Sequence, residues 1–327
     1  MNFLNLEGTG IKELPSSIGL QTKLKSLYLG RTHIESLPKS IKNLTSLRYL
    51  GLHRCMELKT LPELPQSLET LDARGCVSLE DVAFSLTASE QLKEKRKLVY
   101  FWNCHKLNEP SLKAIELNAQ INMMSFSYQH ISEWDRDRDH DQNYNHIMYV
   151  YPGSKVPEWL EYSTTRHDYI TIDLLSAPYF SKLGFVFGFI IPTTTSEGST
   201  LKFEIIVGED DGKSIVLYLD RPRDGFESDH VHLMSNPMCS HYLASRVNDH
   251  SKIKIQVRAS SGTVSPGPTN NITLLPPYVP VRLRGFGVSL VTPSRYDKFK
   301  KQLEFRDGSV VSNNMCPVEE ISKFLGI

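Results

Sequence analysis

A motif that recurs about every 23 residues constrains the fold of this chain more than any other feature. Pairs of apolar residues, separated by one residue, start 23, 23 and 21 residues apart, at Leu4, Leu27, Leu50 and Leu71. A small residue follows each start at the same distance, at Thr9, Thr32, Cys55 and Cys76. Self-similarity of this period predicts a solenoid, in which each turn of the chain stacks on its neighbours.

The pattern is that of a leucine-rich repeat, and its positions have physical reasons. The paired apolar residues lie two apart, so both point into the core from a short strand, while the residue between them points outward. We expect the Thr or Cys to face inward and to meet backbone groups at the turn, and the Leu-Pro steps to end each extended segment. A less regular fifth turn follows from Val99 to Cys104. We therefore predict an α/β leucine-rich-repeat solenoid with short, parallel strands and about five turns over residues 1–108.

The outward-facing strand positions form the concave side of such a solenoid, where repeat proteins usually bind their partners. Aromatic and arginine residues, which are enriched in protein interfaces, occur together at these positions. The simpler alternative for each residue is an ordinary solvated side chain, but for the surface as a whole we favour binding. The predicted partner-binding residues are Tyr28, Arg31, His53, Arg54, Asp72, Arg74, Tyr100 and Trp102.

The first residues, Met1 to Leu4, already lie within a repeat strand. A solenoid needs a polar cap at its end for solubility, and no such cap precedes them. We therefore expect a chain cut from something longer, either a gene fragment or a truncated product.

Beyond the repeats, residues 109–148 are predicted to be a linker with a mobile charged loop at Trp134 to Asp141. The Asp and His residues of this loop suggest a metal site, but interleaved arginines repel cations and no ligand spacing recurs, so we expect no metal. Residues 149–295 contain short alternating segments, such as Lys252 to Arg258, separated by loops rich in Gly, Pro and Ser. They predict a two-sheet β-sandwich. Residues 296–327 are expected to be a partly helical C-terminal tail.

The overall composition argues against several classes of protein. Basic and acidic residues number 37 each, which disfavours binding driven by nucleic-acid phosphates or by a polybasic membrane anchor. Five cysteines without a signal peptide suit a reducing compartment. Motifs for a nucleophile elbow, a zinc protease or a phosphate-binding loop are missing from the sequence, so we expect neither an enzyme nor a cofactor.

The segment from Tyr151 to Trp159, which reads Tyr-Pro-Gly-Ser-Lys-Val-Pro-Glu-Trp, resembles a motif of one known family. Together with the preceding Trp102-Asn103-Cys104 turn, it is similar to the region after the repeats in plant intracellular disease-resistance proteins of the Toll/interleukin-1-receptor, nucleotide-binding, leucine-rich-repeat class. The resemblance implies a jelly-roll or immunoglobulin-like sandwich and recognition of a pathogen effector. It matches the motif at four positions that we expect to be structural, with Trp159 packing the sandwich onto the last repeat: Pro152, Gly153, Pro157 and Trp159.

The resemblance therefore implies a truncated immune recognition module that binds an effector or a host immune receptor, without the nucleotide switch or the NAD-cleaving domain. The concave face and sandwich loops such as 208–212 and 221–226 are the expected contacts. We expect no nucleic-acid or membrane partner, oligomers only through upstream domains, and a cytoplasmic location, with the nucleus as a second candidate. Two alternatives remain: an accessory or decoy scaffold for a full-length receptor, and a carbohydrate-binding sandwich that uses Tyr179, Phe180, Tyr218 and Phe226.

Overall fold

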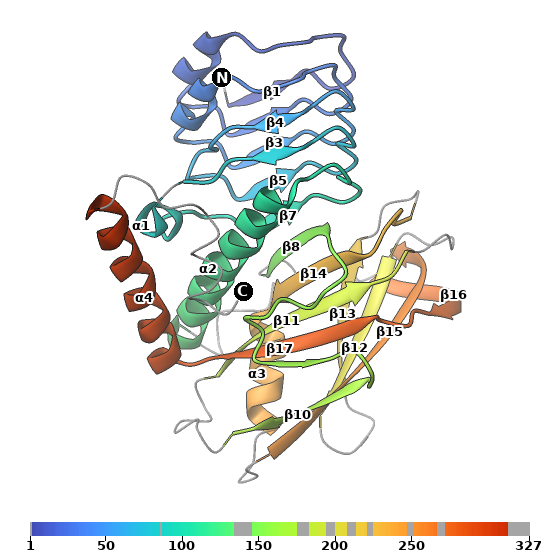
Figure 1. Ribbon diagram of the computed structural model, residues 1–327. Helices are drawn as coiled ribbons and strands as arrows, with labels where there is room; N and C mark the ends of the chain where they lie inside the picture. Colours follow the sequence, from blue (N-terminus) through green and yellow to red (C-terminus); the bar gives the residue numbers. More distant parts are fainter. Residues whose placement is uncertain are drawn as a thin grey trace.

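Short parallel strands, one from each repeat turn, form the first part of the computed structural model, which describes residues 2–85, 87–133, 146–174, 183–193, 200–207, 214–220, 225–246, 252–266 and 272–312 (Figure 1). In order these strands are β1 (Phe3–Asn5), β2 (Ser26–Tyr28), β3 (Tyr49–Gly51), β5 (Thr70–Asp72) and β7 (Leu98–Tyr100). Their register places Leu4, Leu27, Leu50, Leu71 and Val99 side by side, so the predicted leucine-rich-repeat solenoid is confirmed.

From the second turn onward the Thr and Cys residues face inward as predicted, whereas Thr9 of the first turn is exposed. The hydroxyl group of Thr32 donates a hydrogen bond to the carbonyl oxygen of Leu29 at 2.7 Å. The thiols of Cys55, Cys76 and Cys104 each lie 3.1 Å from a carbonyl oxygen of the preceding turn. These side chains satisfy carbonyl groups where the chain leaves the strand, which explains why small polar residues recur there.

The convex side is built from short elements. They are η1 (Ser16–Leu20) and η2 (Lys39–Asn43), the paired strands β4 (Thr60–Leu61) and β6 (Asp81–Val82), and α1 (Ala88–Gln91). Pro15 and Pro38 stand directly before η1 and η2, where a fixed φ and a missing N–H favour a helix start. The helix α1 is a single turn of four residues.

The repeat sheet does not end at the last repeat. Strand β8 (Ile147–Pro152) pairs in parallel with β7, and the antiparallel strands β14 (His230–Ser235), β11 (Gly184–Ile191), β17 (Gly285–Val291) and β9 (Tyr162–Thr164) follow. The result is one 10-stranded sheet that runs from the first repeat into the C-terminal half.

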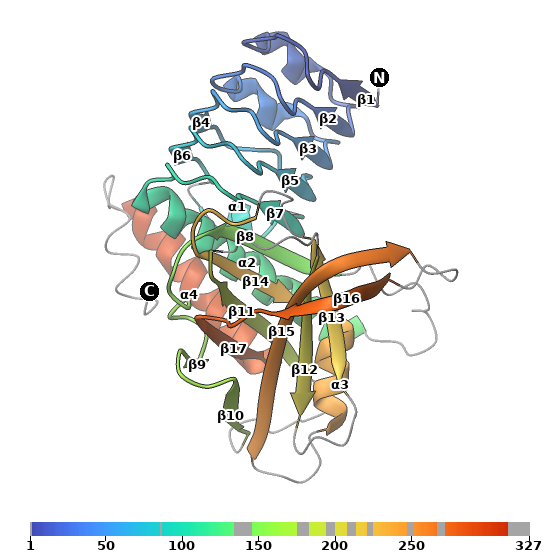
Figure 2. The same ribbon diagram turned by 90° about the vertical axis from the view of Figure 1, so that its right-hand side faces the viewer.

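A second, antiparallel sheet packs over the C-terminal end of the first one (Figure 2). It contains β10 (Tyr169–Asp173), β15 (Lys252–Pro266), β12 (Thr200–Val207), β13 (Ile215–Asp220) and β16 (Ile272–Pro280). The two sheets share one apolar core, in which the rings of Phe189 on β11 and Phe203 on β12 stack at 4.5 Å. The helix α3 (Pro237–Arg246) contributes Cys239 and Leu243 to this core.

Residues expected to form a linker instead begin with a long helix, α2 (Glu109–Glu133), of 25 residues. It contacts β8, β11 and β14 on one side and α1 and α4 (Pro293–Ser312) on others. Because neighbours cover several of its sides, its buried residues do not form a single stripe, which is the sequence signal of a surface helix. The charged loop predicted at Trp134 to Asp141 lies outside the described residues.

The C-terminal tail is helical up to Ser312, and its helix begins at Pro293, three residues before the predicted boundary at 296. Residues 313–327 lie outside the described part of the chain. Within the described ranges, no helix combines the length and the apolar character needed to cross a membrane.

Candidate protein-interaction surface

Three aromatic rings lie side by side across the first three repeat strands. The ring centroids of Phe3 and Tyr28 are 5.0 Å apart, and those of Tyr28 and Tyr49 are 4.7 Å apart in a stacked arrangement. Phe3 remains 54 % exposed, so this aromatic ladder offers apolar surface to a partner. Sequence reasoning found Tyr28 but missed Phe3 and Tyr49. Both precede the paired apolar residues, and the same alternation of inward and outward side chains would have revealed them.

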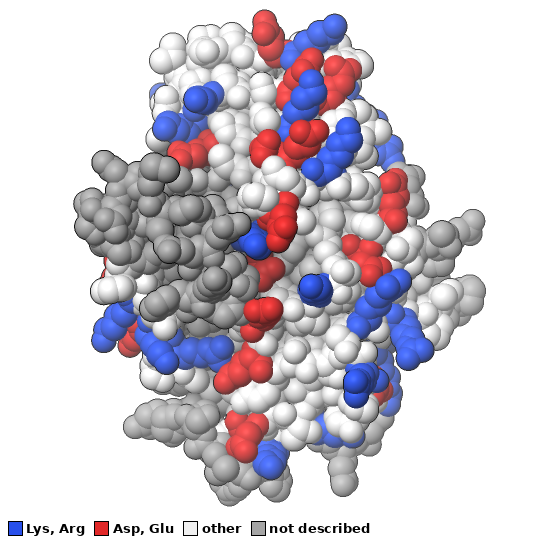
Figure 3. Space-filling model, in the orientation of Figure 1, with Lys and Arg blue, Asp and Glu red and all other residues white. Residues whose placement is uncertain are grey.

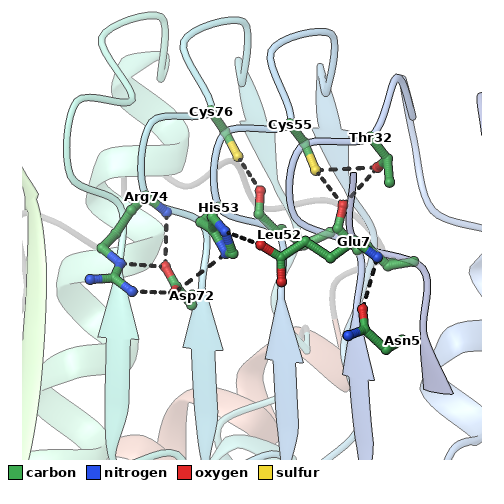
Figure 4. A network of polar contacts seen from close by, with 10 residues as sticks. Asn5, Glu7, Thr32, Leu52, His53, Cys55, Asp72, Arg74 and Cys76 are labelled. Atoms are coloured by element: carbon green, nitrogen blue, oxygen red, sulfur yellow. Dashed lines mark hydrogen bonds and ion pairs between the residues drawn. The ribbon is translucent and has the colours of Figure 1, made fainter. Parts of the chain in front are cut away.

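A chain of polar contacts follows the carboxyl ends of the same strands (Figure 4). Nε2 of His53 lies 3.0 Å from Oε1 of Glu7, although a whole repeat lies between these residues. The side chain of His53 can span this distance because the intervening repeat has Gly30, whose added Cβ would lie only 2.4 Å from the imidazole ring. On its other side, Nδ1 of His53 lies 4.0 Å from Oδ2 of Asp72.

Asp72 and Arg74 form the most constrained part of this chain. Nε and Nη2 of Arg74 donate to the two carboxylate oxygens of Asp72 at 2.7 and 2.6 Å. These hydrogen bonds raise the pKa of the Arg74 guanidinium above its usual value. The same guanidinium lies over the rings of Tyr100 and Trp102, at 5.6 and 5.2 Å from their centroids. Asp72 is only 2 % exposed, so it holds Arg74 in place and does not itself present a contact surface.

Burial also affects Tyr49, the tyrosine at the end of the aromatic ladder. It raises the pKa of Tyr49 to about 12, and the nearby Asp72 carboxylate adds to the effect. The phenol is therefore a neutral hydroxyl group at physiological pH.

Arg31 and Arg54 are exposed and occupy an unusual backbone position. Their φ angles are 59° and 57°, in the left-handed region, and the same position of other repeats has Gly8, Gly75 and Asn103 with φ of 70°, 70° and 57°. The backbone N–H at this position donates to the next repeat, as from Arg31 to His53 at 2.9 Å and from Arg54 to Arg74 at 2.7 Å. The repeat geometry thus fixes where both guanidinium side chains leave the backbone.

The prediction that Trp102 faces a partner is wrong, because its side chain is only 1 % exposed. The indole packs edge-on against Phe226 at 5.9 Å and belongs to the core between the two C-terminal sheets. Side chains that point outward from the last repeat meet the C-terminal half, because that half covers this end of the concave face. Phe226 is buried by the same contact and so cannot serve in a carbohydrate platform, whereas Tyr179 and Phe180 lie outside the described residues.

The last repeat is joined by side-chain hydrogen bonds to residues 225–230, which end at the first residue of β14, and these bonds take the place of a further repeat. The backbone N–H of Asn103 donates to Nε2 of His230 at 3.0 Å, and Nδ1 of His230 donates to the carbonyl oxygen of Ser228 at 2.8 Å. Burial lowers the pKa of His230 to about 4, which keeps Nε2 unprotonated and able to accept. The amide of Asn103 also donates to Gly225 at 3.1 Å.

The four residues of the post-repeat motif lie in and after β8. The N–H of Gly153 donates to Asp229, and a Cβ at this glycine would lie 2.7 Å from Val231. Pro152 ends β8 opposite His230, and Pro157 accepts a hydrogen bond from Leu160. Trp159 is buried beside α2 and α4, where it lines a pocket with Met124 and Phe299. We expected Trp159 to pack the sandwich onto the last repeat, but Trp102 makes this contact instead.

The charges on the face seen in Figure 3 are mixed, with lysines and arginines interspersed among acidic residues over the repeats. Among the described residues, no group of three or more His, Cys, Asp or Glu side chains could hold a metal ion. This face therefore carries no field of a single sign.

Comparison with known proteins agrees with this geometry. A family model described as a leucine-rich repeat region matches residues 1–175. Similar proteins of Arabidopsis thaliana include the disease resistance-like protein DSC1, 32 % identical over 48 % of this chain, and the disease resistance proteins RPS4, 30 % over 50 %, and RPP2B, 34 % over 48 %. The chain spans only 13, 13 and 14 % of the lengths of these relatives, respectively.

Proposed function

Since the chain belongs to the leucine-rich-repeat family, we propose that it is a recognition module of plant innate immunity that binds a partner protein through its repeats. Two observations carry this proposal together. They are the aromatic ladder of Phe3, Tyr28 and Tyr49, and the exposed Arg31 and Arg54, whose backbone conformation the repeat fixes. Aromatic and arginine side chains are enriched among the few residues that contribute most of the binding energy in protein interfaces, and a preorganised scaffold lowers the entropic cost of binding. The disease resistance proteins among its relatives support an immune role.

The partner that this proposal favours is a pathogen effector or a host immune receptor. We assign neither a nucleotide switch nor NAD cleavage to this chain, and we place it in the cytoplasm or the nucleus. We also propose that the C-terminal half is a jelly-roll or immunoglobulin-like sandwich, which two facing antiparallel sheets support. Residues 208–212 and 221–224 stay predicted contacts and lie outside the described residues, whereas Phe226 is buried against Trp102 and is not proposed as a contact.

The test is a change of charge at the two arginines that the backbone holds outward. We expect Arg31→Glu with Arg54→Glu to weaken binding by at least about tenfold, as for the loss of one hot-spot contact. Arg74 is a poor choice, because a glutamate there would face the buried Asp72 carboxylate and destabilise the fold. Binding is measured by biolayer interferometry against purified secreted effectors and the ectopically expressed host receptors.

The matched control is Lys39→Glu with Lys42→Glu, which makes the same charge change on η2 of the convex side. It should leave affinity unchanged. Equal affinity of both double variants and the parent chain for a bound effector or receptor would refute the concave-face proposal.

A further inference from the structure

A pocket of about 400 Å³ lies away from the repeat surface, where the post-repeat motif meets α2 and α4. Its apolar wall is formed by Met124, Trp159 and Phe299, and its polar lining by Gln120, Glu161, Arg295, Lys298 and Gln302. The volume is within the range of roughly 300–1,000 Å³ that is usual for small-molecule sites. The lining has five polar and three apolar residues, so its polar groups determine which ligand fits.

Two buried polar atoms of this lining have no partner among the described residues. They are Nε1 of Trp159, on a side chain that is 6 % exposed, and Oε1 of Gln120, on a side chain that is 8 % exposed. Buried polar groups nearly always form hydrogen bonds, since leaving one unpaired costs about 1–3 kcal/mol. One is a donor and the other an acceptor, so they complement a ligand that both accepts and donates.

The ionisable groups of the lining give the sign of the charge that fits. Arg295 forms an ion pair with Glu161, which neutralises both. Lys298 contributes a further positive charge, so the three groups together carry a net charge of about +1 at neutral pH. An anion is favoured over a cation or a neutral molecule at this site.

We propose that this pocket binds a small organic acid with a flat apolar body and a hydroxyl group. The carboxylate pairs with Lys298 and accepts from the indole N–H of Trp159, the hydroxyl group donates to Gln120, and the body lies against Phe299 and Met124. This activity is separate from the partner binding proposed above and does not depend on it. It gives Trp159 of the post-repeat motif a role in binding in addition to its packing.

The test uses hydroxynaphthoate as the probe, with naphthoate, which lacks the hydroxyl group, and hydroxynaphthamide, which lacks the charge, as matched compounds. The indole N–H resonances of the full chain are followed by ¹H–¹⁵N NMR, and Trp159→Phe assigns the resonance of Trp159. We expect hydroxynaphthoate to shift this resonance with a dissociation constant on the order of 100 µM to 1 mM, which is typical of a ligand of this size. Each matched compound should bind at least about tenfold more weakly, the loss expected for one hydrogen bond or charge contact.

Charge variants on one helix complete the test. Lys298→Glu should weaken hydroxynaphthoate at least about tenfold, whereas Lys301→Glu, an exposed lysine of α4 outside the pocket, should not. A Trp159 resonance that hydroxynaphthoate leaves unmoved would overturn the site. Equal affinity for the acid and the amide, or equal loss in the two lysine variants, would overturn the assignment of an anionic ligand.

Discussion

At the scale of single residues, the repeat imposes a left-handed backbone on the residue that lies three positions after the end of its strand. Arg31 and Arg54 adopt this conformation although both carry a side chain, with φ of 59° and 57°. A non-glycine residue there is strained by about 1–2 kcal/mol, and a β-branched residue by the most. The arginines persist at positions where glycine would fit better, as it does at Gly8 and Gly75.

At position 31 the glycine variant should therefore be more stable than the valine variant, which reverses the order expected at an ordinary exposed position. We expect Arg31→Gly to be neutral or to stabilise the fold by up to about 1 kcal/mol, because relief of strain offsets the entropy of glycine in the unfolded chain. Arg31→Val should destabilise it by about 1–2 kcal/mol. Urea unfolding measures both.

The control is Gln21, an exposed residue with an ordinary φ of −82°. There the glycine variant should be the less stable one, by about 0.5–1 kcal/mol. If the glycine and valine variants had the same order of stability at positions 21 and 31, backbone strain at Arg31 would be ruled out.

Single residues also show how far the sequence alone could lead. The inward positions were predictable, because a repeated Leu or Cys meets the same surroundings in every turn. Trp102 was not, because its repeat position matches that of the half-exposed His53 and Arg74 and only the end of the stack buries it. His53 reaches Glu7 only because Gly30, in the repeat between them, has no side chain in the way. The repeat pattern alone does not indicate this contact.

At the scale of elements, the buried His230 of β14 and the half-buried Glu116 of α2 have opposing effects on stability. Burial lowers the pKa of His230 to about 4 and raises that of Glu116 on α2 to about 7. The hydroxyl group of Tyr151 on β8 donates to the Glu116 carboxylate at 3.4 Å, which offsets the effect of burial only in part.

Each side chain contributes to the free energy of unfolding because its pKa differs between the folded and the unfolded chain. His230 titrates near 6.5 when unfolded, so its contribution is complete above that pH and is lost as the pH falls through about 4. Glu116 titrates near 4.5 when unfolded, so its contribution is complete below that pH and is lost as the pH rises through about 7. Each amounts to about 3 kcal/mol at most, less for the half-buried Glu116.

We predict that the two glutamine variants tilt the pH dependence of unfolding in opposite directions. Relative to the parent chain, His230→Gln should gain stability as the pH is lowered from about 7 to about 4, and Glu116→Gln should lose it. Urea unfolding of the three proteins at several pH values gives the slopes. Parallel curves for His230→Gln and the parent would contradict the neutral, accepting imidazole at the end of the repeats.

The longest element that sequence reasoning missed is α2. Its 25 residues carry apolar groups among Asn, Gln and Ser, without the single stripe that marks a helix lying on a surface. Neighbours on several sides bury polar side chains as well. Asn118, for example, donates to Glu94 at 2.8 Å and accepts from Tyr149 at 2.9 Å. Such a helix is specified by its partners in the folded protein, and local periodicity does not reveal them.

At the scale of the whole molecule, the repeats and the C-terminal half share one sheet and meet at Trp102. We expect Trp102→Ala to cost about 3–5 kcal/mol, as for other buried tryptophans, and to separate the unfolding of the two halves. The control is Trp159→Ala, an equal truncation that lies beside α2 and α4 and away from this junction. It should cost a similar amount while the chain still unfolds in one step.

Calorimetry and hydrogen exchange distinguish these outcomes. In Trp102→Ala the thermal transition should split, and amides of β7 and β8 should exchange faster than those of β12. A single transition with uniform exchange in this variant would show that the strand pairing alone couples the halves.

The histidine that accepts from Asn103 also limits how the repeat array can vary in length. At each earlier turn, the N–H after the strand meets a carbonyl group of another turn, and these turns are interchangeable. At Asn103 it meets an imidazole that belongs to β14, so a turn inserted after this point would have to displace a side chain of the C-terminal half. Duplication or loss of repeats can therefore leave that half intact only among the turns that start at Leu4, Leu27, Leu50 and Leu71.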